Sequence, residues 1–355
     1  MSAYDFTSVP IVGIGAAALE ALDAKQVTFL RALPKAELHA HLNGCIPLAV
    51  LQELAHDYAS ADTPGSVAAG ITRLQEGVVL DKISDFFGLF PAIYALTATR
   101  DSLARATRGV LTHFLDGALP QAAYLELRTT PKTTEHMDKR GYLETVLDEV
   151  EKYSCDTVAL IVSLDRRMDE ETAREVVQLA ALLKQEGRRI VGVDLCGDPH
   201  AGDMTILQKY FRAAKDAGLG VTLHIAETPE NSEEDTHQLL ACEPQRIGHA
   251  TFLNETARRV VCERNICVEI CLTSNVLCKT VPTLQDHHLR HYLQENHPVA
   301  ICTDDTLPFR NSLLGEYALL LAPKPFGLGL SEDEVARIAL MGMDSRFART
   351  IDRLI

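Results

Sequence analysis

Three histidines and one aspartate in this chain have the types and spacing of a metal site that performs hydrolysis. His39 and His41 stand two residues apart, and His224 and Asp304 follow far downstream. Three neutral imidazoles and one carboxylate suit zinc and leave a coordination position for water. A His-x-His pair alone is weak evidence, but the two distant partners make an incidental pair improbable.

Three further residues near this set could position groups or move protons. Glu227 lies three residues after His224, Asp305 directly follows Asp304, and His249 ends another apolar run. Glu227 could instead be a surface acid of an acidic stretch, and His249 could be a packed, hydrogen-bonded residue. Beside a metal ligand, Glu227 becomes a candidate proton shuttle. His249 would then orient the attacking water, and Asp305 would face the substrate.

Eight apolar, β-rich runs, each ending in polar residues, must position these side chains. The predicted strands are Ala36–His41, Ala123–Thr129, Ala159–Asp165, Ile190–Leu195, Gly220–Ala226, Arg246–His249, Cys267–Leu272 and Val299–Thr303. Helical patterns separate most of them, among them Glu170–Lys184, Ile206–Ala217, Asn254–Glu263 and Leu284–Glu295. Near-continuous apolar strands alternating with helices predict a parallel sheet, and eight such units predict a (β/α)8 TIM barrel. The candidate ligands would lie at the C-terminal strand ends, where barrel enzymes place their chemistry.

One segment, Cys45–Leu119, is too long for a single crossover between strands. It holds helical patterns at Leu48–Tyr58, Ile83–Leu96 and Ser102–Leu115, with a break at Ala61–Gly65. We interpret this helical insertion after the first strand as a lid over the barrel mouth. Residues 1–30 are expected to form an N-terminal appendage, and the whole chain, 1–355, a single barrel domain.

The net charge and the cysteine content indicate which binding partners and which cellular compartment to expect. A net charge of −15 argues against binding nucleic acid, which needs clustered Lys and Arg. Nine cysteines without a C-x-x-C pair are typical of free thiols in a reducing compartment. We see no signal peptide and no apolar run near the ~18 residues that cross a bilayer. We expect a monomer in the cytosol that binds a small molecule.

Two absent patterns bear on the metal. Many barrel hydrolases bridge two metals with a Lys on the fourth strand, and the run Ile190–Cys196 has none. The H-x-E and P-C-x-x-C signature of another class of zinc hydrolases is also absent. The sequence therefore predicts one Zn²⁺ per chain.

Longer motifs around these residues resemble those of the adenosine/AMP deaminase superfamily. The resemblance runs from about Leu33 to the C-terminus and is nearest to its adenosine deaminase-like, N6-methyl-AMP deaminase branch. The motifs that carry it are Leu33–Gly44, Tyr124–Lys132, Asp165–Arg167, Asp194–Pro199, Arg246–His249, Cys271–Asn275 and Ile301–Asp305. They are specific in combination.

The resemblance implies a role for each candidate. The implied zinc ligands are His39, His41, His224 and Asp304. Glu227 would donate a proton to purine N1, His249 would hold the attacking water, Asp305 would bond to N7, and Gly197 would let the backbone approach the purine edge. The implied substrate contacts are His41, Asn43, Tyr94, Thr129, Thr130, Pro131, Lys132, Asp165, Gly197 and Asp305.

Asn43 bears most on the choice of substrate. Adenosine deaminases carry Asp there, which suits a ribose hydroxyl but would repel a phosphate. Neutral Asn43 permits a 5′-phosphate, and Lys132 would supply a positive charge, although Thr129–Lys132 could merely turn the chain at Pro131. The family often has Arg in place of Lys132 and His in place of Tyr94.

The predicted function is zinc-dependent hydrolytic deamination of N6-methyl-AMP, and of related N6-substituted AMP, to IMP and an amine in purine nucleotide metabolism. The first alternative is adenosine or adenine deamination by the same residues. The second is an inactive nucleoside-binding protein on this fold.

Overall fold

Eight parallel strands follow one another around a single sheet in the order β1 to β8. The computed structural model describes residues 11–58, 64–76 and 88–350. The strands are β1 (Ala36–His41), β2 (Tyr124–Thr129), β3 (Val158–Asp165), β4 (Ile190–Cys196), β5 (Gly220–Ile225), β6 (Arg246–His249), β7 (Cys267–Ile270) and β8 (Val299–Ile301). Nearly all of their residues are buried because helices cover the outer face and side chains fill the interior.

The first and last strands meet through residues of the predicted metal site. Ala40 of β1 forms a parallel bridge with Asp304, which lies just beyond β8. The His41 backbone N–H donates to Asp304 O at 3.1 Å, and the Asp304 N–H donates to His39 O at 2.9 Å. These bonds close the sheet, so the predicted (β/α)8 barrel is confirmed.

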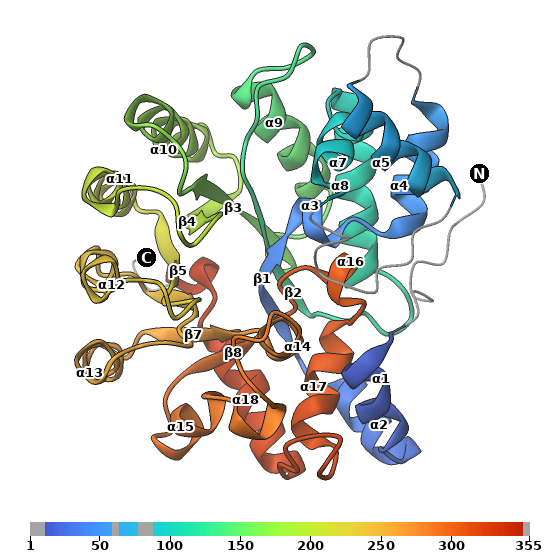
Figure 1. Ribbon diagram of the computed structural model, residues 1–355, viewed down its shortest axis with the longest axis vertical. Coiled ribbons are helices and arrows are strands. Elements are labelled where there is room, and N and C mark those ends of the chain that lie inside the picture. The colour runs from blue at the N-terminus through green and yellow to red at the C-terminus, as the bar shows by residue number, and fades with distance from the viewer. Residues whose placement is uncertain (1–10, 59–63, 77–87, 351–355) are drawn as a thin grey trace.

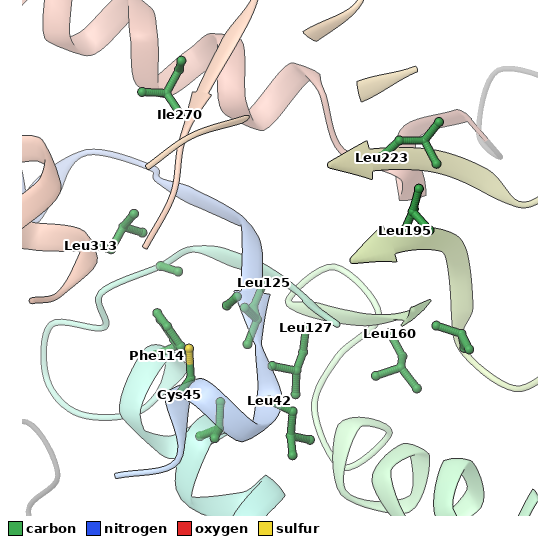
Figure 2. Close-up of a cluster of buried hydrophobic side chains, with 14 of the residues drawn as sticks. Leu42, Cys45, Phe114, Leu125, Leu127, Leu160, Leu195, Leu223, Ile270 and Leu313 are labelled. Atoms are coloured by element: carbon green, nitrogen blue, oxygen red, sulfur yellow. The ribbon is translucent and has the colours of Figure 1, made fainter. Parts of the chain in front are cut away.

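Helices surround the strands, and α10 to α13 follow one another around the outside (Figure 1). The outer helices are α9 (Lys139–Val150), α10 (Glu170–Gln185), α11 (Met204–Asp216), α12 (Glu233–Leu240), α13 (Glu255–Glu263), α15 (Leu289–Gln294), α17 (Leu313–Leu321) and α18 (Glu332–Asp344). Side-chain caps start many of them, for example Asp169 on α10 and Asn254 on α13. Figure 2 shows part of the apolar core between strands and helices, including Leu125 and Leu127 of β2.

The insertion between β1 and β2 is helical, as predicted. It contains α3 (Leu42–Cys45), α4 (Leu48–Asp57), α5 (Gly65–Glu76), α7 (Phe90–Leu96) and α8 (Arg100–Leu115). Helix α8 packs beside β2 and α9 in the barrel wall, whereas α4, α5 and α7 pack on one another at one side (Figure 1). Parts of the predicted break at 61–65 and of the predicted helix at 83–96 lie outside the described residues.

Three predictions of local structure were wrong in detail. Gly65 begins α5 instead of lying in a break, because Pro64 accepts the first helical hydrogen bond from Ala68. The predicted N-terminal appendage contains α1 (Gly13–Glu20) and α2 (Ala24–Ala32), and both pack against α17. The other two corrections concern the segments after β6.

The predicted strand to Leu272 ends at Ile270, and Leu272 begins α14 (Leu272–Leu277). The buried Glu316 carboxylate accepts from the Leu272 and Thr273 N–H groups and so caps this helix. The predicted helix Leu284–Glu295 is divided into the short 3-10 turn η2 (Leu284–Asp286) and α15, because the His287 imidazole accepts from Leu289 N and starts α15 anew.

The short α16 (Thr306–Phe309) follows Asp305, and the 3-10 turn η3 (Phe347–Thr350) follows α18. Within the described ranges, we find no helix that combines the length and apolarity needed to span a bilayer.

Candidate active site

The fold brings the four predicted metal ligands together at the C-terminal ends of the strands. Strand β1 presents His39 and His41, β5 presents His224, and the segment after β8 presents Asp304. The His41 and His224 Nε2 atoms face each other at 3.3 Å, and the His39 and His224 ring centroids are 4.5 Å apart. Asp304 Oδ1 lies 3.6 Å from His39 Nε2 and 3.5 Å from His41 Nε2. Side chains two apart on a strand share one face, so β1 can supply two ligands.

These residues fit a divalent metal ion. Among the described residues, His39 Nε2 is buried and has no hydrogen-bond partner. Burial lowers the pKa of His41 to about 3 and holds the pKa of His39 well below its usual range, so both rings are neutral as ligation requires. Three imidazoles with one carboxylate form a ligand set typical of zinc and related ions. His249 also belongs to the cluster, because one nitrogen each of His39, His224 and His249 lies within 4.8 Å of the others.

Buried carboxylates hold the outer nitrogens of two ligand rings. His39 Nδ1 lies 2.7 Å from Glu269 Oε2, and His224 Nδ1 lies 3.1 Å from Asp194 Oδ1. Arg128 joins the two carboxylates, with Nη1 3.1 Å from Asp194 and Nη2 2.8 Å from Glu269. Carboxylates in this position fix the tautomer and orientation of a ligand imidazole.

Sequence reasoning missed this network, which continues across the barrel interior. Arg246 Nε donates to Glu269 Oε1 at 2.7 Å, and Arg246 Nη1 pairs with Glu126 Oε2 at 2.6 Å. Burial would raise the pKa of Glu269, but Arg128 and Arg246 hold it well below its usual range. The available signal was a charged residue inside an otherwise apolar strand, since such residues are rarely buried unless they are paired.

Gly248 of β6 leaves the space that His39 occupies. A Cβ at this position would lie 2.7 Å from His39 Cε1. We expect Gly248→Ala to displace the ring and weaken divalent metal binding by roughly tenfold or more, in the range found when ligand orientation is disturbed. Titration of metal-free protein measures this, with Gly65→Ala as control because its Cβ would meet nothing within 4 Å. Equal metal affinity in Gly248→Ala and the parent protein would contradict the prediction.

Glu227, His249 and Asp305 lie beside the ligand cluster. Glu227 Oε1 is 3.7 Å from His249 Nε2, and Asn231 Oδ1 accepts from the Glu227 N–H and so holds this loop. The His249 ring lies 5.1 Å from the His39 ring. Asp305 is half-buried against Gly44, and desolvation with the adjacent Asp304 charge raises its pKa well above the usual range. These contacts place three groups able to exchange protons or hydrogen bonds at the cluster.

The backbone is left-handed at several non-glycine residues around the cluster. The φ angles are 50° at Ala226, 60° at His249, 53° at Ala250 and 64° at Asp304. Such conformations are sparsely populated and tend to gather at functional sites. These residues turn the chain sharply at or just after the ends of β5, β6 and β8, beside the site.

The predicted contacts to the nucleotide form a second group. Lys132 Nζ lies 3.8 Å from the centre of the Tyr94 ring, so helix α7 of the insertion reaches the loop after β2. Asp165 at the end of β3 binds Arg167 through both carboxylate oxygens. Gly197 has a φ of 100°, and a Cβ there would lie 2.7 Å from the Asp165 carboxylate. One acid, two bases and an aromatic ring therefore meet in this region, where Asp165 and Arg167 both act electrostatically on Lys132.

The remaining predicted substrate contacts differ in their burial and in their hydrogen bonds. Asn43 is half-buried in α3. The Thr129 hydroxyl bonds to Tyr142 Oη at 2.8 Å. Thr130 Oγ1 lies 3.6 Å from Cys196 Sγ, and Pro131 is buried.

Comparison with known proteins agrees with this architecture. The adenosine deaminase family model matches residues 34–353. N6-Methyl-AMP deaminase of Danio rerio is 36% identical over 321 residues, which cover 86% of this chain and 89% of the relative. N6-mAMP deaminase of Arabidopsis thaliana is 35% identical over 349 residues, covering 90% and 94%. The crystal structure of Arabidopsis ADAL complexed with IMP has a TM-score of 0.78 and 34% identity, covering 92% of this chain and 96% of that chain. This chain therefore belongs to the adenosine deaminase family.

Proposed function

We propose that this protein hydrolyses N6-methyl-AMP to IMP and methylamine. The observation that carries the proposal is the convergence of His39, His41, His224 and Asp304 beside Glu227 and His249. Relatives that share about a third of its residues over most of its length are named N6-methyl-AMP deaminases. The proposed metal is one zinc ion held by the four converging residues. What such an ion supplies when bound is a lower pKa, near ~7, for a coordinated water.

The neighbouring side chains handle the proton transfers. Glu227, in its acid form, donates a proton to N1 of the purine and thereby weakens the aromatic character of the ring before water attacks C6. His249 lies 3.7 Å from Glu227 and orients the attacking water. Asp305 is half-buried with a raised pKa, so it can donate a hydrogen bond to N7. Water then replaces the methylamino group at C6, and methylamine leaves.

The second group of side chains would receive the sugar and phosphate. We propose that Asn43, Thr130 and Lys132 bind the 5′-phosphate and that the Gly197 backbone contacts the purine edge. Asp165, already bonded to Arg167, would accept from a ribose hydroxyl. The proximity of Tyr94 to Lys132 supports the further proposal that part of the segment 45–119 covers the bound nucleotide.

All nine cysteines are free thiols, and six of them are buried. Unpaired thiols in this number suit a reducing compartment, so we propose that the protein works in the cytosol. Our expectation of a monomer stays a prediction.

Parallel assays with N6-methyl-AMP, AMP, adenosine and adenine test the proposed function. Loss of the 6-amino group changes purine absorbance, and kcat/KM can be compared among the four compounds. The proposal expects the highest kcat/KM with N6-methyl-AMP. A higher value with adenosine or adenine would assign the alternative substrates, and inactivity of zinc-loaded protein with all four would indicate a binding protein.

Asn43→Asp should shift selectivity from the monophosphate to the nucleoside. A carboxylate ~4 Å from a phosphate repels it by roughly 4 kcal/mol at an effective dielectric of about 20, before relaxation and screening. Even a third of this is about tenfold in binding. We therefore expect kcat/KM for N6-methyl-AMP to fall at least about tenfold more than kcat/KM for N6-methyladenosine.

Lys132→Ala should shift selectivity in the same direction by removing a favourable charge. Neither residue belongs to the proposed metal ligands, so slow nucleoside turnover should survive both substitutions. An unchanged ratio of the two kcat/KM values in both variants would refute the proposed phosphate site and leave the deaminase reaction itself standing.

A further inference from the structure

His249 enters the site with a side chain that no hydrogen bond holds. Both of its ring nitrogens are buried and lack hydrogen-bond partners among the described residues. Its backbone is left-handed, with a φ of 60°, and Ala250 follows with a φ of 53°. The direction of the His249 ring therefore depends on what holds this unusual stretch of backbone in place.

One side chain holds that backbone directly. His288 Nε2 lies 2.7 Å from the His249 carbonyl oxygen, 39 residues away in sequence. A carbonyl oxygen only accepts, so this nitrogen carries the proton and donates. His288 directly precedes α15 and is half-buried beside its neighbours.

A second histidine and helix α14 support His288. The His287 and His288 rings are stacked, with centroids 4.4 Å apart and an interplanar angle of 21°. His287 Nδ1 accepts from Leu289 N at 3.1 Å, so its Nε2 carries the proton and donates to Asn275 Oδ1 at 3.1 Å. Because both nitrogens of His287 are engaged, its ring forms a fixed surface against which His288 rests.

The same helix also contacts the metal-ligand side of the site. Ser274, next to Asn275 in α14, donates to Asp304 Oδ2 at 2.7 Å. Helix α14 thus connects the Asp304 carboxylate with the pair of histidines behind His249. This accounts for the motif Cys271–Asn275, to which the proposed reaction assigns no direct contact with substrate.

We propose that His288 is a positioning residue for His249: its hydrogen bond to the His249 carbonyl sets the direction of the His249 ring at the reacting centre. The proposal rests on the proposed function, in which His249 orients the attacking water. A misplaced orienting group slows the chemical step, since a shift near 1 Å can cost up to about 100-fold. Substrate and metal binding use other residues and should be little affected.

Three substitutions at His288 separate the hydrogen bond from the bulk of the ring. His288→Gln places an amide N–H near the former Nε2 position and should keep kcat within about twofold. His288→Asn has the same amide on a shorter side chain that cannot reach, and His288→Leu has no donor. For Asn and Leu we expect kcat for N6-methyl-AMP to fall roughly tenfold, with KM and bound metal unchanged.

His297 provides a matched control. Its Nε2 likewise lies 2.7 Å from a carbonyl oxygen, that of Ile266, and His297 is buried, but Ile266 precedes β7 at the opposite end of the barrel. His297→Leu should therefore lower thermal stability about as much as His288→Leu while kcat stays near the parent value.

The outcomes are distinct. Recovery of kcat in His288→Gln, with loss in His288→Asn, supports the proposal. Parent-like kcat in His288→Asn, or an equal loss in the His297→Leu control, overturns it. If His288→Leu does not fold, His288→Asn in a His249→Ala background decides, because a residue that acts through His249 should cause no further loss there. Inactive parent enzyme would overturn the proposed function instead, and it would be evident before any variant is made.

Discussion

Removal of the metal is expected to abolish deamination, and His224→Ala is expected to lose the metal itself. The four proposed ligands come from β1, β5 and the segment after β8. The substitution His224→Ala removes one of these four. Chelation should leave no measurable turnover, and added Zn²⁺ should restore it in the parent protein only. Metal analysis alongside the assay measures both effects.

The control for this experiment is His56→Ala, an exposed histidine near the end of α4. It should keep its metal and its activity. Parent protein should contain about one ion per chain, as a four-residue site with a single open position predicts. Two tightly held ions per chain would contradict the mononuclear site, and full activity after complete chelation would contradict a metal role altogether.

Glu227→Gln is expected to lower kcat at least about 100-fold, in line with the usual contribution of a general acid. The amide keeps the shape of the side chain but cannot transfer its proton to N1. Glu227 is not among the proposed ligands, so bound metal should stay at the parent level. Steady-state kinetics with N6-methyl-AMP, together with metal analysis, separates the loss of proton transfer from loss of the ion.

Glu230→Gln is a suitable control, because Glu230 is an exposed acid in the same loop. It removes one negative charge near the site without touching the reacting centre and should leave kcat nearly unchanged. Near-full turnover in Glu227→Gln would show that another group is the acid.

The convergence of His39, His41, His224 and Asp304 could be predicted because each lies near or just beyond the C-terminal end of an apolar strand. In a parallel barrel all such ends meet, so His39 and Asp304 could be expected together although they are 265 residues apart in the numbering. The number of strands could be predicted because each strand is an apolar, β-rich run. The start of α14 could not be predicted in this way, because the carboxylate that caps it belongs to Glu316, which lies on another helix.

The network behind the ligands could not be predicted in the same way. Glu269, Arg128 and Asp194 lie on β7, β2 and β4, and their contacts depend on which side chains share a layer inside the closed barrel. The left-handed backbone at His249 is also invisible in sequence, because glycine is the usual sign of a positive φ and this position has none. The support from His288 follows from that backbone and was equally hidden.

The closing seam of the barrel has a consequence for folding. The backbone hydrogen bonds between Asp304 and the β1 histidines join the first and last strands of the sheet. They also lie where the proposed ligands meet. A partly folded chain cannot offer the full set, so an ion stabilises only the completed barrel. At 100 times its Kd, such an ion adds about 2.7 kcal/mol to the free energy of unfolding. Scarcity of the ion would then reduce the amount of folded protein as well as the turnover of the enzyme. Expression in metal-poor medium would therefore yield less folded protein.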